Sequence, residues 1–130
     1  MRFAVIPAFN EADTISSVID CISSFVDYVV VVNDFSTDCT STVASNHGVI
    51  VLNNIENIGY DASIYTGMLH AYDLGATSII TLDGDGQHNY ADFSSLFLRL
   101  ADTADSIVIG SRDSHPRFSE SFISLLSLWF

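Results

Sequence analysis

The sequence predicts an α/β fold with three layers, α/β/α, built around a mainly parallel sheet. Two observations predict it. Short apolar runs alternate with segments of helical periodicity along the whole chain, and the run 28–32 (Tyr-Val-Val-Val-Val) is apolar on both faces. Strands of a parallel sheet are covered by helices on both sides, so they read as continuous apolar runs.

Five strands are expected, each a short apolar run that ends in polar residues. They cover residues 3–6, 28–32, 49–52, 78–82 and 106–109. A loop, residues 7–11, is expected after the first strand because Pro7 interrupts the apolar run. Parallel strands need crossover connections, and helical segments of suitable length lie between these runs.

The helices are placed by their caps and apolar stripes. Asn10 is a good N-cap for the first, with Asp13 as a weak capping-box partner. The second helix is expected at 38–45, the third at 61–74 and a fourth after Asn89. The first stripe is Ile15, Val18, Ile19, Ile22 and Phe25, and the third helix carries Ile64, Tyr65, Met68, Ala71 and Tyr72 on one face.

Composition excludes one class of partner. The chain has 130 residues, 48% of them hydrophobic, and a formal net charge of −12, which fits one acidic globular domain. Nucleic-acid binding is not expected, because a phosphate backbone needs a basic face. Cys21 and Cys39 form no C-x-x-C motif and predict free, buried thiols in a reducing compartment, hence a cytoplasmic protein without a secretory signal or membrane-spanning run.

Polar residues follow four of the five expected strands. They are Asn10 and Glu11 after the first, Asp34 after the second, Asp83 and Asp85 after the fourth, and Arg112 after the fifth. The carboxyl ends of parallel strands share one edge of the sheet, which is where such folds bind ligands. The sequence therefore predicts a binding site at this edge.

Residues 81–88 (Thr-Leu-Asp-Gly-Asp-Gly-Gln-His) carry the most informative cluster. Two carboxylates one residue apart repel each other unless a positive group lies between them, and hard divalent cations prefer carboxylate oxygens. Gly84 would allow close approach. The alternative is that both Asp residues only form a turn. A G-x-G-x-x-G dinucleotide motif after the first strand is absent from the sequence.

The other candidates also have structural alternatives. Asp34 would accept a hydrogen bond from a ligand N–H, or would form a turn or helix cap. Arg112 would bind phosphate through its planar guanidinium, or would make a structural ion pair. Glu11 would contact the ligand, or would favour the first turn of its helix through the macrodipole.

Five segments together resemble the family 2 glycosyltransferases, which have the GT-A fold. The segments are Val5–Glu11, Asn33–Thr40, Asn57–Gly59 with Ala62 and Gly67, Asp83–His88 and Ile109–Arg112. The fourth segment is most similar to the polyprenyl-phosphate glycosyltransferases, such as the dolichyl-phosphate mannose synthases. Three departures concern the second and third segments: Phe35 and Cys39 replace glycines, and Tyr60-Asp61 stands where small or basic residues are frequent.

The resemblance implies a role for each candidate residue. Residues 1–112 would be the Rossmann-like, nucleotide-sugar-binding half of a GT-A fold. The nucleotide pocket would be lined by Pro7, Ala8, Phe9 and Glu11, and Asp34 would accept a hydrogen bond from the base. Asp83 would face the ribose or sugar, and Asp85 would hold Mg²⁺ or Mn²⁺. Gln87 would contact the sugar or phosphate, and Arg112 would bind the phosphate charge.

The function implied is metal-dependent, inverting transfer of a sugar from a UDP- or GDP-sugar, as in cell-wall or polysaccharide synthesis. Asp83, Asp85 and Arg112 would be the catalytic residues, and a polyprenyl phosphate is one candidate acceptor. The alternative is a donor-binding or interaction module without transfer activity of its own.

Because the family's domain usually extends further, the chain looks truncated to the donor half. Residues 113–130 would then begin an acceptor-side region. The apolar stretch 118–130 would contact the inner face of a membrane or a second copy.

Overall fold

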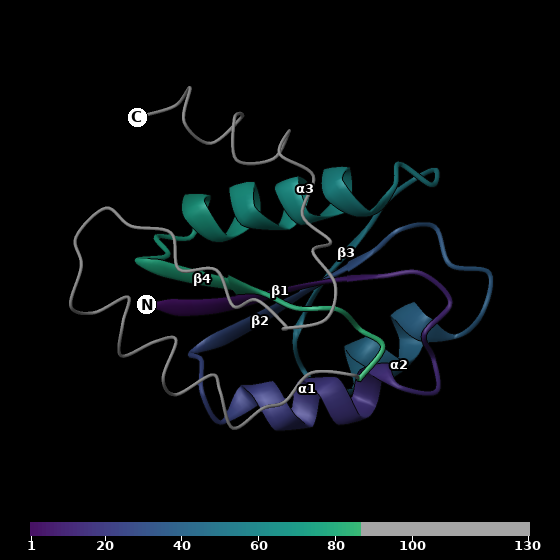
Figure 1. Cartoon of the computed structure of the whole chain (residues 1–130), viewed down its shortest axis with the longest axis horizontal. Coiled ribbons are helices and arrows are strands. Elements are labelled where there is room, and N and C mark those ends of the chain that lie inside the picture. Colours follow the sequence, from purple (N-terminus) through teal and green to yellow (C-terminus); the bar gives the residue numbers. More distant parts are fainter. Residues whose placement is uncertain (87–130) are drawn as a thin grey trace, which may run out of the picture. The chain divides into compact units, whose positions relative to one another are not determined.

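The structure is a computed structural model that describes residues 1–86, and these form a parallel sheet covered on both faces (Figure 1). The strands are β1 (Arg2–Ala8), β2 (Tyr28–Asn33), β3 (Ile50–Asn53) and β4 (Ser78–Thr81). Their order in the sheet is β3-β2-β1-β4, and each neighbouring pair is parallel. The predicted α/β/α fold is confirmed.

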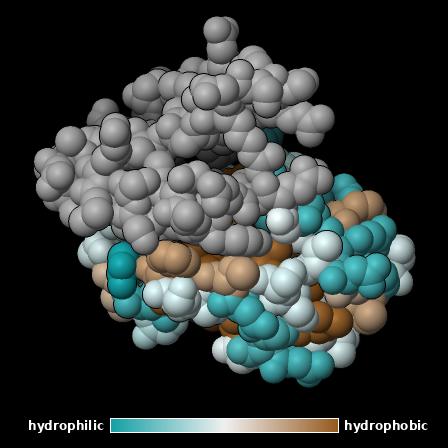
Figure 2. Space-filling view, turned by 60° about the horizontal axis from the view of Figure 1, so that its bottom comes forward, coloured by the Kyte–Doolittle hydropathy of each residue, from teal (hydrophilic) through white to brown (hydrophobic). Residues whose placement is uncertain are grey.

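Three helices make the outer layers. Helices α1 (Ile15–Ser23) and α2 (Thr40–Asn46) lie on one face of the sheet, and α3 (Tyr60–Asp73) lies on the other (Figure 1). The space-filling view brings the α1 and α2 side forward, and apolar residues show there between polar ones (Figure 2). The expected fifth strand, the helix after Asn89 and the boundary between 112 and 113 lie outside the described residues.

The core is built on the two central strands. Phe3, Val5, Val30 and Val32 form one buried cluster, with Ala71 of α3 packed on it. Alternate residues of a strand point to opposite faces, so Ala4, Ile6 and Val31 face the other layer. There the α1 stripe is buried as predicted at Ile15, Val18, Ile19 and Ile22, whereas Phe25 lies beyond the end of the helix and is half-buried.

Strand β1 runs through Pro7 and Ala8, which contradicts the expected loop from residue 7. Pairing with β2 continues to Ala8, whereas pairing with β4 stops at Val5. The Val5 carbonyl accepts from Leu82 on the β4 side, and the Ala8 carbonyl accepts from Asp34 on the β2 side. Pro7 therefore faces the β4 side, where its missing N–H ends the ladder without disturbing β2.

The expected N-cap at Asn10 is wrong. Helix α1 begins at Ile15 after Thr14, and the turn before it is closed by the Glu11 carbonyl, which accepts from the N–H groups of Thr14 and Ile15. Asn10 has a left-handed backbone, with φ of 56°, and its side-chain oxygen accepts from the Thr37 N–H at 2.8 Å. Asn tolerates this conformation, so it joins two loops instead of capping the helix.

The buried face of α3 also differs from the prediction. Tyr65 and Tyr72 are exposed by 46% and 73%, while Ser63, Ile64, Gly67 and Ala71 are buried. A Cβ at Gly67 would lie 2.4 Å from Val5 Cγ1 and 2.9 Å from Val32 Cγ2. The helix thus approaches the sheet through small residues.

Two smaller predictions concern thiols and membrane spans. Both cysteines are free, as predicted, but Cys39 is exposed and Cys21 only half-buried, so the expectation of buried thiols is wrong. Cys39 immediately precedes α2, in a loop whose backbone is held by Asp38. Among residues 1–86, no helix is long and apolar enough to cross a bilayer.

Candidate functional site

The loops after β1 and β2 are joined to each other at the carboxyl edge of the sheet. The Asn10 N–H donates to Ser36 Oγ at 3.0 Å, and the Glu11 N–H donates to Thr40 Oγ1 at 2.8 Å. Asp38 accepts from the Ala12 N–H at 3.1 Å and from the Thr40 N–H at 2.9 Å, so it also joins the loops. These bonds keep the polar residues after β1 and β2 in fixed positions.

Asp34 organises the loop that leads into α3. Its carboxylate is only 3% exposed and accepts from Asn54 Nδ2, the Ile58 N–H and the Gly59 N–H, each at 2.9 Å. Burial alone would raise the pKa of Asp34, but these hydrogen bonds, with Ser63, outweigh burial and lower the pKa. Asp34 therefore remains charged and holds residues 54–59 against the end of β2.

Glu11 lies against the acidic loop that follows β4. A Cβ on Gly84 would be 1.9 Å from Glu11 Oε2, so any other residue at position 84 would displace the Glu11 carboxylate. Glu11 Oε2 is buried and has no hydrogen-bond partner among the described residues. Burial, followed by the charges of Asp85, Asp83 and Asp38, raises the pKa of Glu11 from 4.5 to about 7.

Tyr60, the first residue of α3, contacts the same loop. Its hydroxyl donates a hydrogen bond to Asp83 Oδ1. Partial burial, then this hydrogen bond and the charge of Asp83, raises the pKa of Tyr60. The phenol therefore stays protonated and remains a donor to the carboxylate.

Two half-exposed aromatic side chains lie close in the sequence to Glu11 and Asp34. Phe9 is 48% exposed and Phe35 is 52% exposed. Phe35 has a φ of 62°, the conformation in which glycine is favoured. Pro7 and Ala8, in contrast, are buried within β1.

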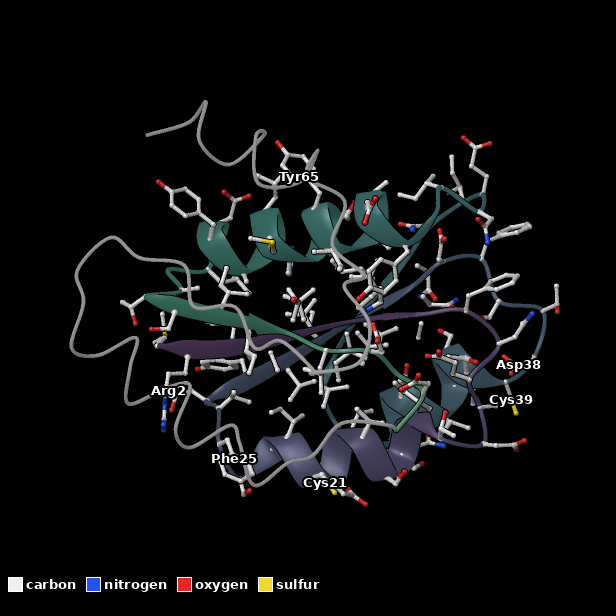
Figure 3. The ribbon with its side chains drawn as sticks, in the orientation of Figure 1. Arg2, Cys21, Phe25, Asp38, Cys39 and Tyr65 are labelled. Carbon is white, nitrogen blue, oxygen red and sulfur yellow. The ribbon has the colours of Figure 1, made fainter. Side chains whose placement is uncertain are left out.

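Cations are scarce in the described part of the chain. Arg2 is the single Arg or Lys among residues 1–86, and it pairs with Asp27 at 4.0 Å. Arg2 lies at the opposite end of the sheet from Asp38, which marks the loops of the carboxyl edge (Figure 3). Positive charge at this edge must therefore come from a bound cation or from residues beyond 86.

The structure brings most of the predicted site residues to one edge. Glu11, Asp83 and Asp85 are neighbours, and Asp34 is joined to Asp83 through the loop that ends at Tyr60. Gln87 and Arg112 lie outside the described residues. Within residues 1–86, no three His, Cys, Asp or Glu side chains are arranged to hold a metal ion by themselves.

Sequence reasoning missed three contributors. Asp38 joins two loops, Asn54 bonds Asp34, and Tyr60 bonds Asp83. Asp38 and Asn54 each follow a strand in the sequence, so their position at this edge of the sheet could have been predicted. The only hint at Tyr60 was that small or basic residues are frequent at this position in the family.

With this geometry in view, comparison with known proteins defines the class. The model of the family described as Glycosyl transferase family 2 matches residues 3–124. The chain belongs to glycosyl transferase family 2, and the predicted family is confirmed.

Two curated proteins are similar to this chain in sequence. The UDP-N-acetylglucosamine–dolichyl-phosphate N-acetylglucosaminyltransferase of Methanococcus voltae is 28% identical, covering 88% of this chain and 53% of that protein. A dolichyl-phosphate beta-glucosyltransferase of Trichomonas vaginalis is 31% identical, covering 87% of this chain and 40% of that protein. The chain thus spans about half, or less, of these relatives' length.

A solved structure is similar over a shorter range. Glucosyl-3-phosphoglycerate synthase from Mycobacterium tuberculosis, in complex with Mn²⁺, UDP-glucose and phosphoglyceric acid, is 30% identical. The match has a TM-score of 0.51 and covers 65% of this chain and 33% of that one. The likeness supports the α/β fold described above.

Proposed function

We propose that this chain binds a nucleotide-diphosphate sugar at the carboxyl edge of its sheet and acts in metal-dependent transfer of the sugar with inversion. The observation that carries the proposal is the contact of Glu11 with the loop of Asp83, Gly84 and Asp85. This loop adds two carboxylates to that of Glu11. The family membership and the UDP-glucose and Mn²⁺ in the similar synthase support the same conclusion.

The acidic cluster fits a hard divalent cation. Glu11 Oε2 is buried with no hydrogen-bond partner among residues 1–86, and burial, followed by like charges, raises the pKa of its carboxyl group to about 7. A cation between Glu11 and Asp85 would relieve both conditions, and carboxylate oxygens suit Mg²⁺ or Mn²⁺. Too few protein ligands lie within the described residues to fill the coordination shell, so oxygens of the donor diphosphate would complete it.

Each residue then has a separate task in donor binding. We assign Asp85 to the metal and Asp83 to the ribose or sugar. Asp34 holds the loop beside the base, and the exposed ring of Phe9 borders the pocket with the backbone of Pro7 and Ala8. Gln87 and Arg112 are assigned to the sugar and to phosphate charge.

The transfer step is a displacement at the anomeric carbon. The acceptor oxygen forms a bond to that carbon as the bond to the nucleotide diphosphate breaks, and the diphosphate leaves with the electron pair. A bound divalent cation stabilises the charge that grows on the leaving diphosphate. Arg112 would add to this stabilisation, and Asp83 would keep the ribose fixed while the bond breaks.

The acceptor class follows from the relatives and from charge. Dolichyl phosphate appears in the names of two relatives, and we propose a polyprenyl phosphate acceptor. A phosphate oxygen is already anionic and needs no general base, whereas a hydroxyl acceptor would need one. Contact with the inner face of the membrane through residues 118–130 would bring the chain to such an acceptor.

Titration calorimetry with a UDP-sugar and a GDP-sugar, each with and without Mn²⁺, tests donor binding. We expect one of the two to bind, and to bind much more tightly with Mn²⁺. Absence of binding to either nucleotide in the presence of metal would contradict the proposal. Release of free nucleotide on adding a polyprenyl phosphate then separates a transferase from a donor-binding module, which would bind the sugar nucleotide and leave it intact.

A further inference from the structure

The hydrogen bond between Tyr60 and Asp83 links the start of α3 to the loop that follows β4. Tyr60 opens α3 on one face of the sheet, and Asp83 follows β4. The Tyr60 hydroxyl donates to Asp83 Oδ1, which restricts rotation of that carboxylate. Tyr60 is 51% exposed, so its ring contributes less to the core than a buried aromatic would.

The position of Tyr60 is itself set by Asp34. The Asp34 carboxylate accepts from the N–H groups of Ile58 and Gly59, the two residues that precede Tyr60. Gly59 has a φ of 89°, which turns the chain sharply into α3, and its carbonyl accepts from Ser63 in the first turn of the helix. A buried charge at the end of β2 therefore fixes the backbone from which Tyr60 reaches Asp83.

We propose that Tyr60 is a positioning residue: anchored by Asp34, it orients the Asp83 carboxylate for the ribose or sugar of the bound donor. This inference rests on the proposed function. It also gives a role to the departure from the family pattern at this position, because a small residue there could not donate a side-chain hydrogen bond to Asp83. Partial burial and the neighbouring acid keep the phenol protonated, so the donor is present at any ordinary pH.

A double-mutant cycle tests this inference on the full 130-residue chain. The variants are Tyr60→Phe, Asp83→Ala and the pair, and calorimetry measures the affinity for UDP and for GDP with Mn²⁺. Tyr60→Phe should weaken binding of the preferred nucleotide about tenfold, equivalent to about 1.4 kcal/mol. In the Asp83→Ala background the same change should have less than about a twofold effect, because Tyr60 acts through Asp83.

Tyr72→Phe is the matched control, since Tyr72 lies on the same helix and is 73% exposed. It should leave the affinity unchanged. A loss that is equal with and without Asp83 would mean that Tyr60 acts on folding or on the nucleotide directly, and would overturn the inference. Unchanged binding in Tyr60→Phe would overturn it too, with the proposed function intact. A wild-type chain that binds neither nucleotide would overturn the proposed function itself.

Discussion

Phe35 has a backbone that an L-residue adopts at a cost. Its φ of 62° is left-handed, and this conformation is unfavourable by roughly 1–2 kcal/mol for a residue with a Cβ. The family pattern has glycine at this position, which adopts the conformation without that cost. The side chain is half exposed, so burial of the ring offsets only part of the strain.

Phe35→Gly should therefore be more stable than Phe35→Ala, by about 1 kcal/mol. Both changes remove the ring, but only glycine relieves the backbone. Urea unfolding of the two variants measures the difference. Phe9 is the matched control, because it is similarly exposed and its φ is not positive. At position 9 the alanine variant should be the more stable, and the same order at both positions would contradict the account.

Glu11 makes stability depend on pH. Its pKa is raised from 4.5 to about 7 in the folded chain, so the folded state binds the proton more tightly than the unfolded state. The resulting stabilisation is complete below pH 4.5 and is lost as the pH rises to about 7. Relative to Glu11→Gln, the wild type should lose free energy of unfolding over this range, by at most about 1.4 kcal/mol per pH unit.

Urea unfolding of both proteins in EDTA across this pH range measures the effect. Asp13→Asn, which removes an exposed carboxylate from the same loop, is the control and should follow the wild type. Added Mn²⁺ should reduce the difference between wild type and Glu11→Gln, because a bound cation favours the charged carboxylate. If the free energies of unfolding of the wild type and of Glu11→Gln changed equally with pH in EDTA, the environment assigned to Glu11 would be contradicted.

At the scale of single residues, the sequence predicted the cluster at the sheet edge but not its contacts. Asp83, Asp85 and Glu11 were expected there because each follows a strand, and the structure places them together. The Tyr60 bond to Asp83 could not be predicted, because it depends on how a loop of residues 54–59 folds around Asp34. Asn10 was misassigned because the same side chain can cap a helix or bond a neighbouring loop.

Among the elements, α3 shows how packing against the sheet overrides a pattern of hydrophobic residues. The large apolar residues suggested a face containing Tyr65 and Tyr72. The helix buries Ile64 and Ala71 of that predicted face, but Ser63 and Gly67 lie beside them in place of the tyrosines. A close helix leaves room only for small side chains, and the width of that gap is a tertiary property. Pro7 gave a similar error, since its tolerance within β1 depends on where β4 stops pairing.

Gly67→Ala should destabilise the chain by about 1–3 kcal/mol, because the new Cβ overpacks against Val5 and Val32. Intrinsic helix propensity predicts the opposite, a gain of about 1 kcal/mol. Urea unfolding decides between them. Adding Val5→Ala supplies the missing space, so the double variant should be more stable than the sum of the single changes implies. A stabilised Gly67→Ala variant would show that α3 does not approach the sheet as described.

For the whole molecule, the acidic character limits how it can meet a membrane. The net charge of −12 opposes binding to anionic lipid, so any attachment must rely on the apolar residues of 118–130. We predict that the chain co-sediments with neutral phosphatidylcholine vesicles and that removal of 118–130 abolishes this. Trp129→Ser with Phe130→Ser should weaken it in the full-length chain. Equal sedimentation of the full chain, the chain without 118–130 and the double variant would contradict the membrane proposal.

The α/β architecture was predictable because parallel strands and their covering helices leave a clear pattern in apolar residues. An acceptor side was not predictable, because the sequence beyond residue 86 offers only a strand-like run, Arg112 and an apolar stretch toward it. The charge distribution links the residues of the site to the whole molecule. With Arg2 paired at the far end of the sheet, the proposed function makes the acids at the carboxyl edge dependent on a divalent cation.

Asp85→Asn tests that dependence most directly. The measurement is the ratio of nucleotide affinities with and without Mn²⁺, obtained by calorimetry for the wild type and for the variant. We predict a large ratio for the wild type and a ratio near one for Asp85→Asn, with metal-free affinity little changed. Equal ratios in the two proteins would mean that Asp85 holds no metal, and would contradict the account of this site.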